Sequence, residues 1–500
     1  YFKKLIEELN LPYSILNKSL NTYHHHFGIN FKLYDNVIDL LKLLKSHNIK
    51  IGILSNNIFL QQYNKLMISG ILEYIDIIQT SDEAGNEKPY HDIFLNIIDK
   101  FRKLNIQPEN IAIVGDNFNH DINPSFIYNF KFLPFHFIEN CDNLNSNSLY
   151  SKVFLNKDHL TFSNYKDFHA FFEEYFKTVN ELVFLSKYFG QSTLNVQGPG
   201  GNISVKLSDM IFIKSSGAVL GNLHETDGYC IANNKECLRL MDENNENGLK
   251  ETKIYGKNVP SMETFFHSFM KKYTVHIHFT LSNIYFCSNH QLDTSLLKFP
   301  FKIIDYIPPG LALAKEILNV YDIDTSIYFL KNHGLIITSD NLLSLLSEYE
   351  NIFNTFNSIL HNDFAYDYYS FLINKTYYLN TKKSIIIKNL YNYPVEILMN
   401  MKYCFPDLAI FVQNILITDS LDEVYQKMQK IHESQIFYNI IIFKRKIFLL
   451  AENLNKVYYI IELLEQYKLI CEFSYDNLIT IDNITYLQNM PQEKFRKELR

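Results

Sequence analysis

Between residues 35 and 140, short apolar runs alternate with longer segments in which apolar residues recur every three or four positions. KIGILSNN (50–57) and NIAIVGDN (110–117) have the pattern of buried strands. NVIDLLKLLKS (36–46) and YHDIFLNIIDKFRKL (90–104) have the spacing of amphipathic helices. The alternation predicts β-α-β units around a parallel sheet, and the preceding residues predict short helices that cap the open end of that sheet.

The pattern changes after about residue 140, where the chain becomes polar and irregular (ENCDNLNSNSLYSK). A long helical pattern (EEYFKTVNELVFLSKYFG) then leads into a glycine-rich turn and a series of strands mixed with helices, and a further block of short strands and helices follows. These shifts predict three parts: an N-terminal α/β domain at 1–142, a second domain at 170–375 and a C-terminal α/β extension at 385–500.

Composition favours a small-molecule partner. The chain of 500 residues has 47 Lys and Arg against 54 Asp and Glu, a net charge of −7 that gives no general attraction to nucleic acid or anionic membranes. Its six cysteines form no C-x-x-C pair, which disfavours a thiolate zinc knuckle or a disulfide scaffold and fits a reducing cytoplasm. No apolar run reaches the ~18 residues that would span a membrane.

Several histidines and one glutamate are spaced as zinc ligands. His276 and His278 alternate in a strand-like run, so both rings project from one strand face. His333 is followed by Gly334, which permits a sharp turn, and Glu263 begins a helical segment. Three histidines with a replaceable carboxylate suit a catalytic zinc, which needs a position open to substrate. An H-x-H pair alone is more often structural, so its context decides.

That context consists of five motifs in order: GPGGNIS (198–204), IKSSG (213–217), PSMETFFH (260–267), HIHF (276–279) and KNHG (331–334). Their succession resembles the class II aldolase/adducin family, which includes fuculose and rhamnulose phosphate aldolases and ribulose phosphate epimerase. The resemblance implies an α/β/α domain, Zn²⁺ as cofactor and a sugar phosphate such as a phosphorylated ketose as substrate.

Carried over position by position, the resemblance implies roles for individual residues. His276, His278 and His333 would bind zinc, and Glu263 would be both a displaceable ligand and the catalytic acid/base. Asn202, Ser216 and Gly217 would hold the substrate phosphate, next to glycines whose backbone N–H groups can face an anion. Lys214 either adds positive charge there or is a solvated strand residue.

A second set of motifs lies in the N-terminal domain: ILSNN (53–57), EKPYHDIF (87–94) and VGDNFNHD (114–121). They resemble the second, third and fourth motifs of the haloacid dehalogenase-like hydrolases, which have a Rossmann-like fold. The resemblance implies that Ser55 and Lys88 bind a phosphoryl group and that Asp116 and Asp121 bind Mg²⁺.

The first motif of that family, an Asp nucleophile in D-x-D, has no counterpart before Leu33. We therefore expect an N-terminally truncated phosphatase-like domain with a remnant of its helical cap. The alternative is an inactive phosphatase kept for structure. The D-I-D at 322–324 stands just before a strand and reads as a turn.

Together the two motif sets predict a bifunctional cytoplasmic enzyme: a zinc aldolase fused to a phosphatase-like domain. The alternatives are a zinc-dependent epimerase or decarboxylase, which needs the same metal chemistry, and a non-catalytic adducin-like binding module. The C-terminal YCFPDLAIF (403–411) resembles the extension of longer family members and predicts an accessory or oligomerisation unit. We expect a homo-oligomer, a tetramer by preference.

Overall fold

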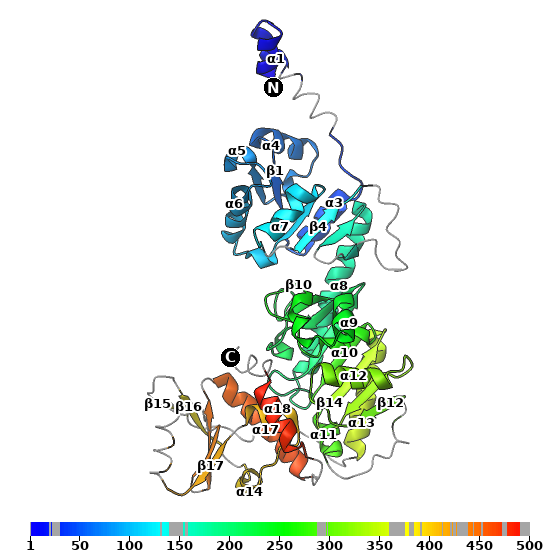
Figure 1. Cartoon of the computed structure of the whole chain (residues 1–500), viewed down its shortest axis with the longest axis vertical. Helices are drawn as coiled ribbons and strands as arrows, with labels where there is room; N and C mark the ends of the chain where they lie inside the picture. Colours follow the sequence, from blue (N-terminus) through cyan, green and yellow to red (C-terminus); the bar gives the residue numbers. More distant parts are fainter. Residues whose placement is uncertain are drawn as a thin grey trace. The chain divides into compact units, whose positions relative to one another are not determined.

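The chain forms two compact units, residues 1–177 with 254–256 and residues 178–253 with 257–500, so that the division falls within helix α8 (Tyr165–Gly190) (Figure 1). The computed structural model describes the chain except for residues 1, 20–21, 23–30, 131–132, 140–153, 156–158, 288–296, 298, 360–375, 380–384, 391–392, 413, 421–422, 424–426, 428–438, 444, 452–453, 473–477 and 491–500.

The first unit is an α/β arrangement built on parallel strands. Its strands are β1 (Gly52–Ser55), β2 (Ile77–Thr80), β3 (Ala112–Gly115), β4 (Leu133–Phe137), β5 (Phe154–Leu155) and β6 (Leu160–Phe162). β1 pairs in parallel with β2, β3 with β4 and β4 with β6, whereas β5 lies antiparallel on β6. The helices are α1 (Phe2–Glu8), α3 (Val37–Ser46), α4 (Phe59–Ile68), α5 (Ser81–Ala84), α6 (His91–Arg102) and α7 (Asn123–Ile127).

Helix α6 shows why this sequence folds in this way. Its apolar residues recur at helical spacing, and Ile93, Phe94 and Ile98 are buried together on one face. That face packs against Leu54 of β1 and Ile113 of β3. One helix therefore covers a strand that precedes it in the chain and a strand that follows it. The β-α-β reading of this region is confirmed.

The second unit is built on an eight-stranded sheet with the order β10-β9-β8-β7-β11-β14-β13-β12. From β9 to β13 in this order, neighbouring strands are antiparallel, and β12 is parallel to β13. The strands are β7 (Asn202–Leu207), β8 (Met210–Lys214), β9 (Tyr229–Asn233), β10 (Lys253–Tyr255), β11 (Tyr273–Ile277), β12 (Phe301–Ile304), β13 (Ile327–Leu330) and β14 (Gly334–Ser339).

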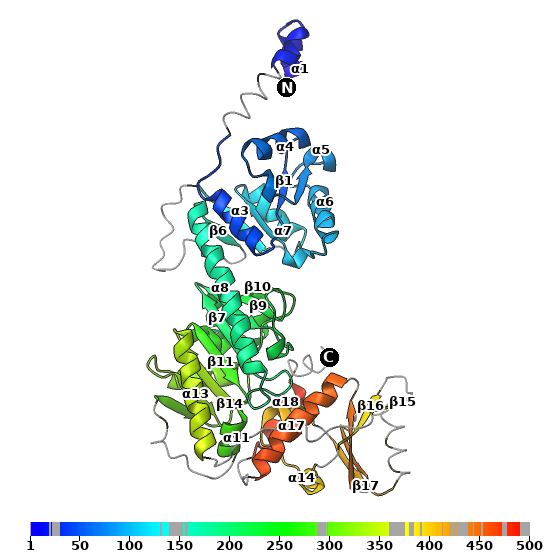
Figure 2. The same ribbon diagram turned by 180° about the vertical axis from the view of Figure 1, so that it is seen from behind.

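Helices cover both faces of this sheet, because successive side chains of a strand point to opposite sides. In β13, Tyr328 joins the core beneath α9 (Asn234–Asp242), α10 (Thr264–Phe269) and α12 (Leu311–Val320), whereas Phe329 contacts Phe356 on the other side. The opposite layer consists of α8, α11 (Thr280–Phe286) and α13 (Leu342–Ile359), as Figures 1 and 2 show from the two sides. The expected α/β/α architecture is confirmed.

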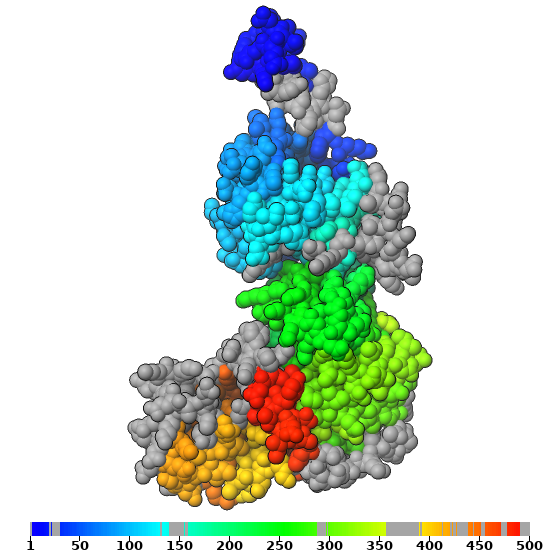
Figure 3. Space-filling model, in the orientation of Figure 1, coloured from blue at the N-terminus to red at the C-terminus, as the bar shows by residue number. Residues whose placement is uncertain are grey.

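The C-terminal residues form a smaller α/β part of the same unit. Its five-stranded sheet has the order β15-β16-β19-β18-β17. In Figure 3 the red C-terminal residues of this part lie directly against the green surface of the part that contains the eight-stranded sheet. Its elements are β15 (Thr376–Leu379), β16 (Ile385–Leu390), β17 (Ile415–Thr418), β18 (Ile440–Phe443), β19 (Lys446–Ala451), α14 (Val395–Met399), α15 (Pro406–Phe411), α17 (Leu454–Glu472) and α18 (Ile481–Asn489).

The structure also describes the D-I-D segment at 322–324 and the length and polarity of the helices. The D-I-D segment is a turn, in which the backbone N–H of Thr325 donates to the carbonyl of Asp322 at 3.0 Å. Within the part of the chain that the structure describes, no helix is long and apolar enough to cross a membrane.

Candidate metal centre

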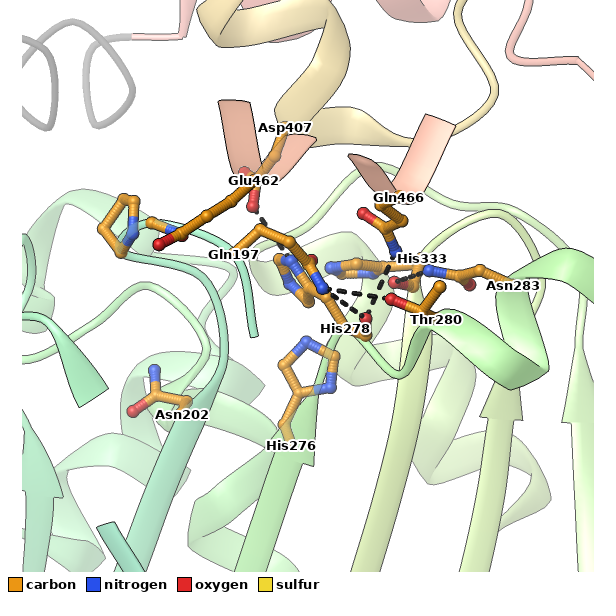
Figure 4. A network of polar contacts seen from close by, with 12 residues as sticks. Gln197, Asn202, His276, His278, Thr280, Asn283, His333, Asp407, Glu462 and Gln466 are labelled. Carbon is orange, nitrogen blue, oxygen red and sulfur yellow. Dashed lines mark hydrogen bonds and ion pairs between the residues drawn. The ribbon is translucent and has the colours of Figure 1, made fainter. Parts of the chain in front are cut away.

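The three histidines of the predicted zinc site come together at one end of the central sheet. His276 lies in β11, His278 follows the last residue of that strand, and His333 directly precedes β14. β11 and β14 are antiparallel neighbours with Ile277 opposite Leu335, so the register places the end of one strand beside the start of the other. All three side chains are buried, and one ring nitrogen of each lies within 4.8 Å of the other two (Figure 4).

A glycine permits this close approach. A Cβ atom at Gly334 would lie 2.2 Å from the carbonyl oxygen of Ile277, which is much closer than two such atoms can come. Gly334 therefore allows β14 to begin directly against the end of β11. The sequence N-H-G thus places His333 at the closest point between the two strands.

Glu263 completes the cluster from the helical side. It occupies the residue before α10, and its Oε1 lies 3.3 Å from Nε2 of His276 and 3.7 Å from Nε2 of His333. Asn202, opposite His276 in the pairing of β7 with β11, directs its side-chain amide toward Glu263 at 3.5 Å. Four of the predicted residues therefore meet, with Asn202 beside them.

Burial sets the charge state of this cluster. Burial lowers the pKa of His333 well below its usual value, and the neighbouring His276 and His278 lower it further, so that ring is neutral as a metal ligand must be. Burial by itself would raise the pKa of Glu263, but the facing histidines, His276 first, hold it well below the usual value. Histidine nitrogens together with an anionic carboxylate are a donor set that suits Zn²⁺.

His267, on the same helix, does not join the cluster. Its Nδ1 lies 2.7 Å from the hydroxyl oxygen of Ser204, and its side chain is fully buried. Burial lowers the pKa of His267 to about 3, so its ring is neutral at ordinary pH.

A pocket opens onto the cluster and onto the candidate phosphate-binding residues. Its empty space of about 490 Å³ includes open solvent, so the pocket is a partly open hollow rather than an enclosed cavity. Lys214, Ser216 and Gly217 line it together with Glu263, His278 and His333. Asn202 is not among the lining residues. Lys214 is buried and donates to the carbonyls of Pro199 and Ala218, so it is not a solvated strand residue.

Two polar lining residues, Ser261 and Asp407, were not assigned from the sequence. Ser261 stands two positions before Glu263 in the PSMETFFH motif, and that proximity could have identified it. Asp407 comes from α15 in the C-terminal part, and its Oδ2 lies 2.9 Å from Nδ1 of His278. The P-D dipeptide was visible in the sequence, but nothing in it indicated which core residue the carboxylate would reach.

The predicted phosphatase-like residues lie in the first unit. Lys88 and Asp121 form an ion pair with 2.5 Å between Nζ and Oδ1, and Asp121 also accepts from the backbone N–H of Asn117. Ser55 ends β1 and donates to the side chain of Gln62 at 3.1 Å. Asp116 follows β3 directly and is exposed. The structure therefore joins two of the four in a direct contact.

Two family profiles match this chain. Residues 1–133 match the haloacid dehalogenase-like hydrolases, and residues 180–356 match the class II aldolase and adducin N-terminal domain. The chain thus joins a haloacid dehalogenase-like domain to a class II aldolase-like domain. Both families are enzyme superfamilies, and the three clustered histidines lie in the class II aldolase-like domain.

Individual relatives cover parts of the chain. Glyceraldehyde 3-phosphate phosphatase from Methanothermobacter thermautotrophicus is 37% identical over 101 residues, which are 20% of this chain and 43% of that protein. The chain thus spans less than half the length of this curated relative. A class II aldolase domain from Thermoplasma acidophilum is 26% identical with a TM-score of 0.34, covering 36% of this chain and 93% of that one. An L-fuculose 1-phosphate aldolase is 19% identical with a TM-score of 0.28, covering 38% and 88%.

Proposed function

We propose that the class II aldolase-like domain is a zinc-dependent carbon–carbon lyase that acts on a phosphorylated ketose. The observation that carries this proposal is the convergence of His276, His278 and His333 on Glu263, at the wall of a pocket that also contains Lys214. A structural histidine cluster would not need an anionic carboxylate facing it or an open pocket lined by a buried lysine beside it.

The histidines would hold the metal and Glu263 would move a proton. Zinc, when bound there, supplies a Lewis acid that withdraws negative charge from the carbonyl and hydroxyl oxygens of the ketose. Its lowered pKa keeps Glu263 ionised, so it would be the group that exchanges a proton with the carbon next to the substrate carbonyl. Its neighbour Asn202 fixes its orientation through the contact to Oε2.

The other end of the pocket would take the phosphate. Lys214 brings a buried positive charge, and Ser216 and Gly217 lie beside it. We retain Asn202 in this set, because its amide nitrogen carries two hydrogens and only one can point to Glu263. Ser261 joins the set as a further hydroxyl in the same wall.

For the first unit we propose a phosphate site with Mg²⁺. Ser55 and Lys88 would bind the phosphoryl group, and Asp116 and Asp121 would bind the cation through oxygen. The curated relative of this region is named for the dephosphorylation of a three-carbon sugar phosphate. We also propose that this unit has phosphatase activity on a related sugar phosphate. The proposed domain boundaries are 1–142, 170–375 and 385–500.

Two other functions of the same fold remain as alternatives. An epimerase or a decarboxylase would need the same zinc chemistry at a carbon beside a carbonyl, and product analysis separates these reactions. An adducin-like binding module would need no metal. Glu263 and the three histidines, all turned toward one point, favour an enzyme over the binding module.

The decisive assay supplies phosphorylated ketoses to the zinc-loaded protein and identifies the products. We expect cleavage into two shorter carbonyl compounds, loss of activity with a chelator and recovery with zinc. Borohydride together with substrate should leave activity intact, because no Schiff-base lysine takes part. Inactivation by borohydride, or cleavage that survives complete metal removal, would contradict the mechanism.

We also propose that the protein forms a homo-oligomer, most simply a tetramer, and that it is located in the cytoplasm. Light scattering at the protein concentration used for the assay measures the oligomeric state. A monomer that is fully active would remove the need for a partner subunit.

A further inference from the structure

The C-terminal part of the chain contributes a carboxylate to the metal centre. Asp407 stands in the first turn of α15 and is 2% exposed. Its Oδ2 lies 2.9 Å from Nδ1 of His278, a hydrogen-bond distance. Figure 4 shows Asp407 on the side of the histidines from which the C-terminal helices approach.

Further contacts hold this segment against the histidine strands. The carbonyl of Cys404 accepts from the side-chain amide of Asn332 at 2.9 Å, and Asn332 directly precedes His333. From α17, Gln466 donates to the carbonyl of His278 at 3.3 Å. The position of Asp407 is therefore fixed by contacts to the same two stretches of backbone that carry the zinc-site histidines.

The glycine-rich turn leaves space for the contact. A Cβ atom at Gly200 would lie 2.7 Å from Nδ1 of His278 and 2.9 Å from Oδ2 of Asp407. Any side chain at this position would push into the contact between the two residues. From the other side, Glu462 of α17 accepts from the backbone N–H of Gly198 at 2.7 Å and so ties the turn to the C-terminal part.

We propose that Asp407 is a positioning residue for the metal centre: its carboxylate accepts a hydrogen bond from Nδ1 of His278 and so directs Nε2 of that ring toward the metal. This inference rests on the proposed function, because it assumes that His278 is a zinc ligand. A histidine ligand that donates its second ring nitrogen to a carboxylate is fixed in tautomer and orientation and is a stronger donor. The C-terminal part is then a component of the site as well as an extension of the fold.

Three variants of the full-length protein test this role. Asp407→Ala removes the acceptor, Asp407→Asn keeps an oxygen acceptor without the charge, and Gly200→Ala pushes a methyl group into the contact while leaving both partners in place. Asp482→Asn is the matched control, because Asp482 is exposed on α18 of the same C-terminal part. Thermal unfolding of each variant checks that the protein is folded.

The main readout is zinc affinity by competition with a chromophoric chelator. Loss of an outer partner of a metal-bound histidine weakens metal binding by about 10- to 100-fold, which we expect for Asp407→Ala. Gly200→Ala should weaken binding by a similar factor, Asp407→Asn by less, and the control should match wild type. If Asp407→Ala fails to fold, Asp407→Asn and Gly200→Ala carry the comparison.

The second readout is the visible absorption spectrum of the cobalt-substituted protein, which reports ligand geometry without any turnover. The spectrum should change in Asp407→Ala and in Gly200→Ala and should be unchanged in Asp482→Asn. A residue that only stabilised the fold would lower the unfolding temperature without altering the spectrum of the folded protein.

The outcomes separate this inference from the proposed function. Wild-type zinc affinity with an unchanged cobalt spectrum in Asp407→Ala overturns the inference, and so does zinc loss as complete as that of His278→Ala, which would make Asp407 a direct ligand. The expected affinity series in a protein that cleaves no phosphorylated ketose supports the inference and overturns the proposed lyase.

Discussion

The metal centre and the phosphatase-like cluster are both assembled from short motifs that are far apart in the sequence, but they differ in what holds them. In the candidate metal centre, the histidines lie in or directly beside two neighbouring strands of a sheet covered on both faces. In the phosphatase-like cluster, Asp116 is an exposed residue after a strand, and Lys88 lies in a loop before α6. Strand register fixes the first cluster, whereas loops and one ion pair fix the second.

The difference shows what each motif can determine. Once β7, β11 and β14 are paired, the positions of His276 and Asn202 follow from the register. Asp121 instead reaches its place because Gly115 has no side chain: a Cβ there would lie 2.2 Å from that of Asp121.

Among the substitutions that compare the two clusters, Glu263→Gln should have the largest effect, which is on turnover. The amide keeps the shape of the side chain but can no longer exchange a proton, which typically costs about 10²- to 10⁴-fold in turnover. We expect a loss of that size in ketose cleavage while zinc content is retained, because the three histidines still hold the metal. Turnover is measured with zinc in excess.

Glu348→Gln serves as the control for Glu263→Gln, since Glu348 is a partly buried glutamate of α13 away from the histidines. Its turnover should match wild type. If Glu263→Gln retained wild-type turnover, Glu263 would not be the proton carrier.

A smaller effect is expected from breaking the ion pair of the first unit. Lys88→Met leaves the largely buried Asp121 without its cation, and such losses cost about 3–5 kcal/mol when the pair is fully buried. Since Lys88 is partly exposed, we expect about 2–3 kcal/mol. Amide hydrogen exchange of β3 and α6 measures the opening of this unit alone.

The double variant Lys88→Met, Asp121→Asn is the matched control, because it removes the unpaired charge as well. It should recover part of the lost protection. Equal losses in the single and double variants would show that the pair is not what holds this cluster.

The smallest effect, counted per pH unit, concerns the pH dependence of stability in the metal-free protein. Burial lowers the pKa of His267 from 6.5 to about 3. Between these values the unfolded chain binds a proton at this residue and the folded chain does not, so the free energy of unfolding falls as the pH falls. The slope from one such group is at most about 1.4 kcal/mol per pH unit.

Urea unfolding at several pH values between neutrality and the acid limit of the fold measures this slope. His267→Gln should be less stable than wild type but should lose less stability on acidification. A slope identical to that of wild type would contradict the assignment of a buried, neutral His267.

Much of this molecule could be predicted from the sequence, because its determinants are local. The apolar period of α6 and the strand run around His276 are visible without any tertiary information, and both folds follow from them. The contact of Asp407 with His278 could not be predicted in the same way, since it depends on how α15 docks on the core. The pairing of Lys88 with Asp121 is equally a product of packing.

The most direct test of the account is the zinc content of purified wild-type protein beside His278→Ala and His267→Gln, by elemental mass spectrometry. His267 is a buried histidine of the same region whose Nδ1 contacts the hydroxyl oxygen of Ser204, so its variant controls for the loss of any buried ring. We expect about one zinc per chain in wild type and in His267→Gln, and none in His278→Ala. Absence of zinc from all three, or full retention in His278→Ala, would contradict it.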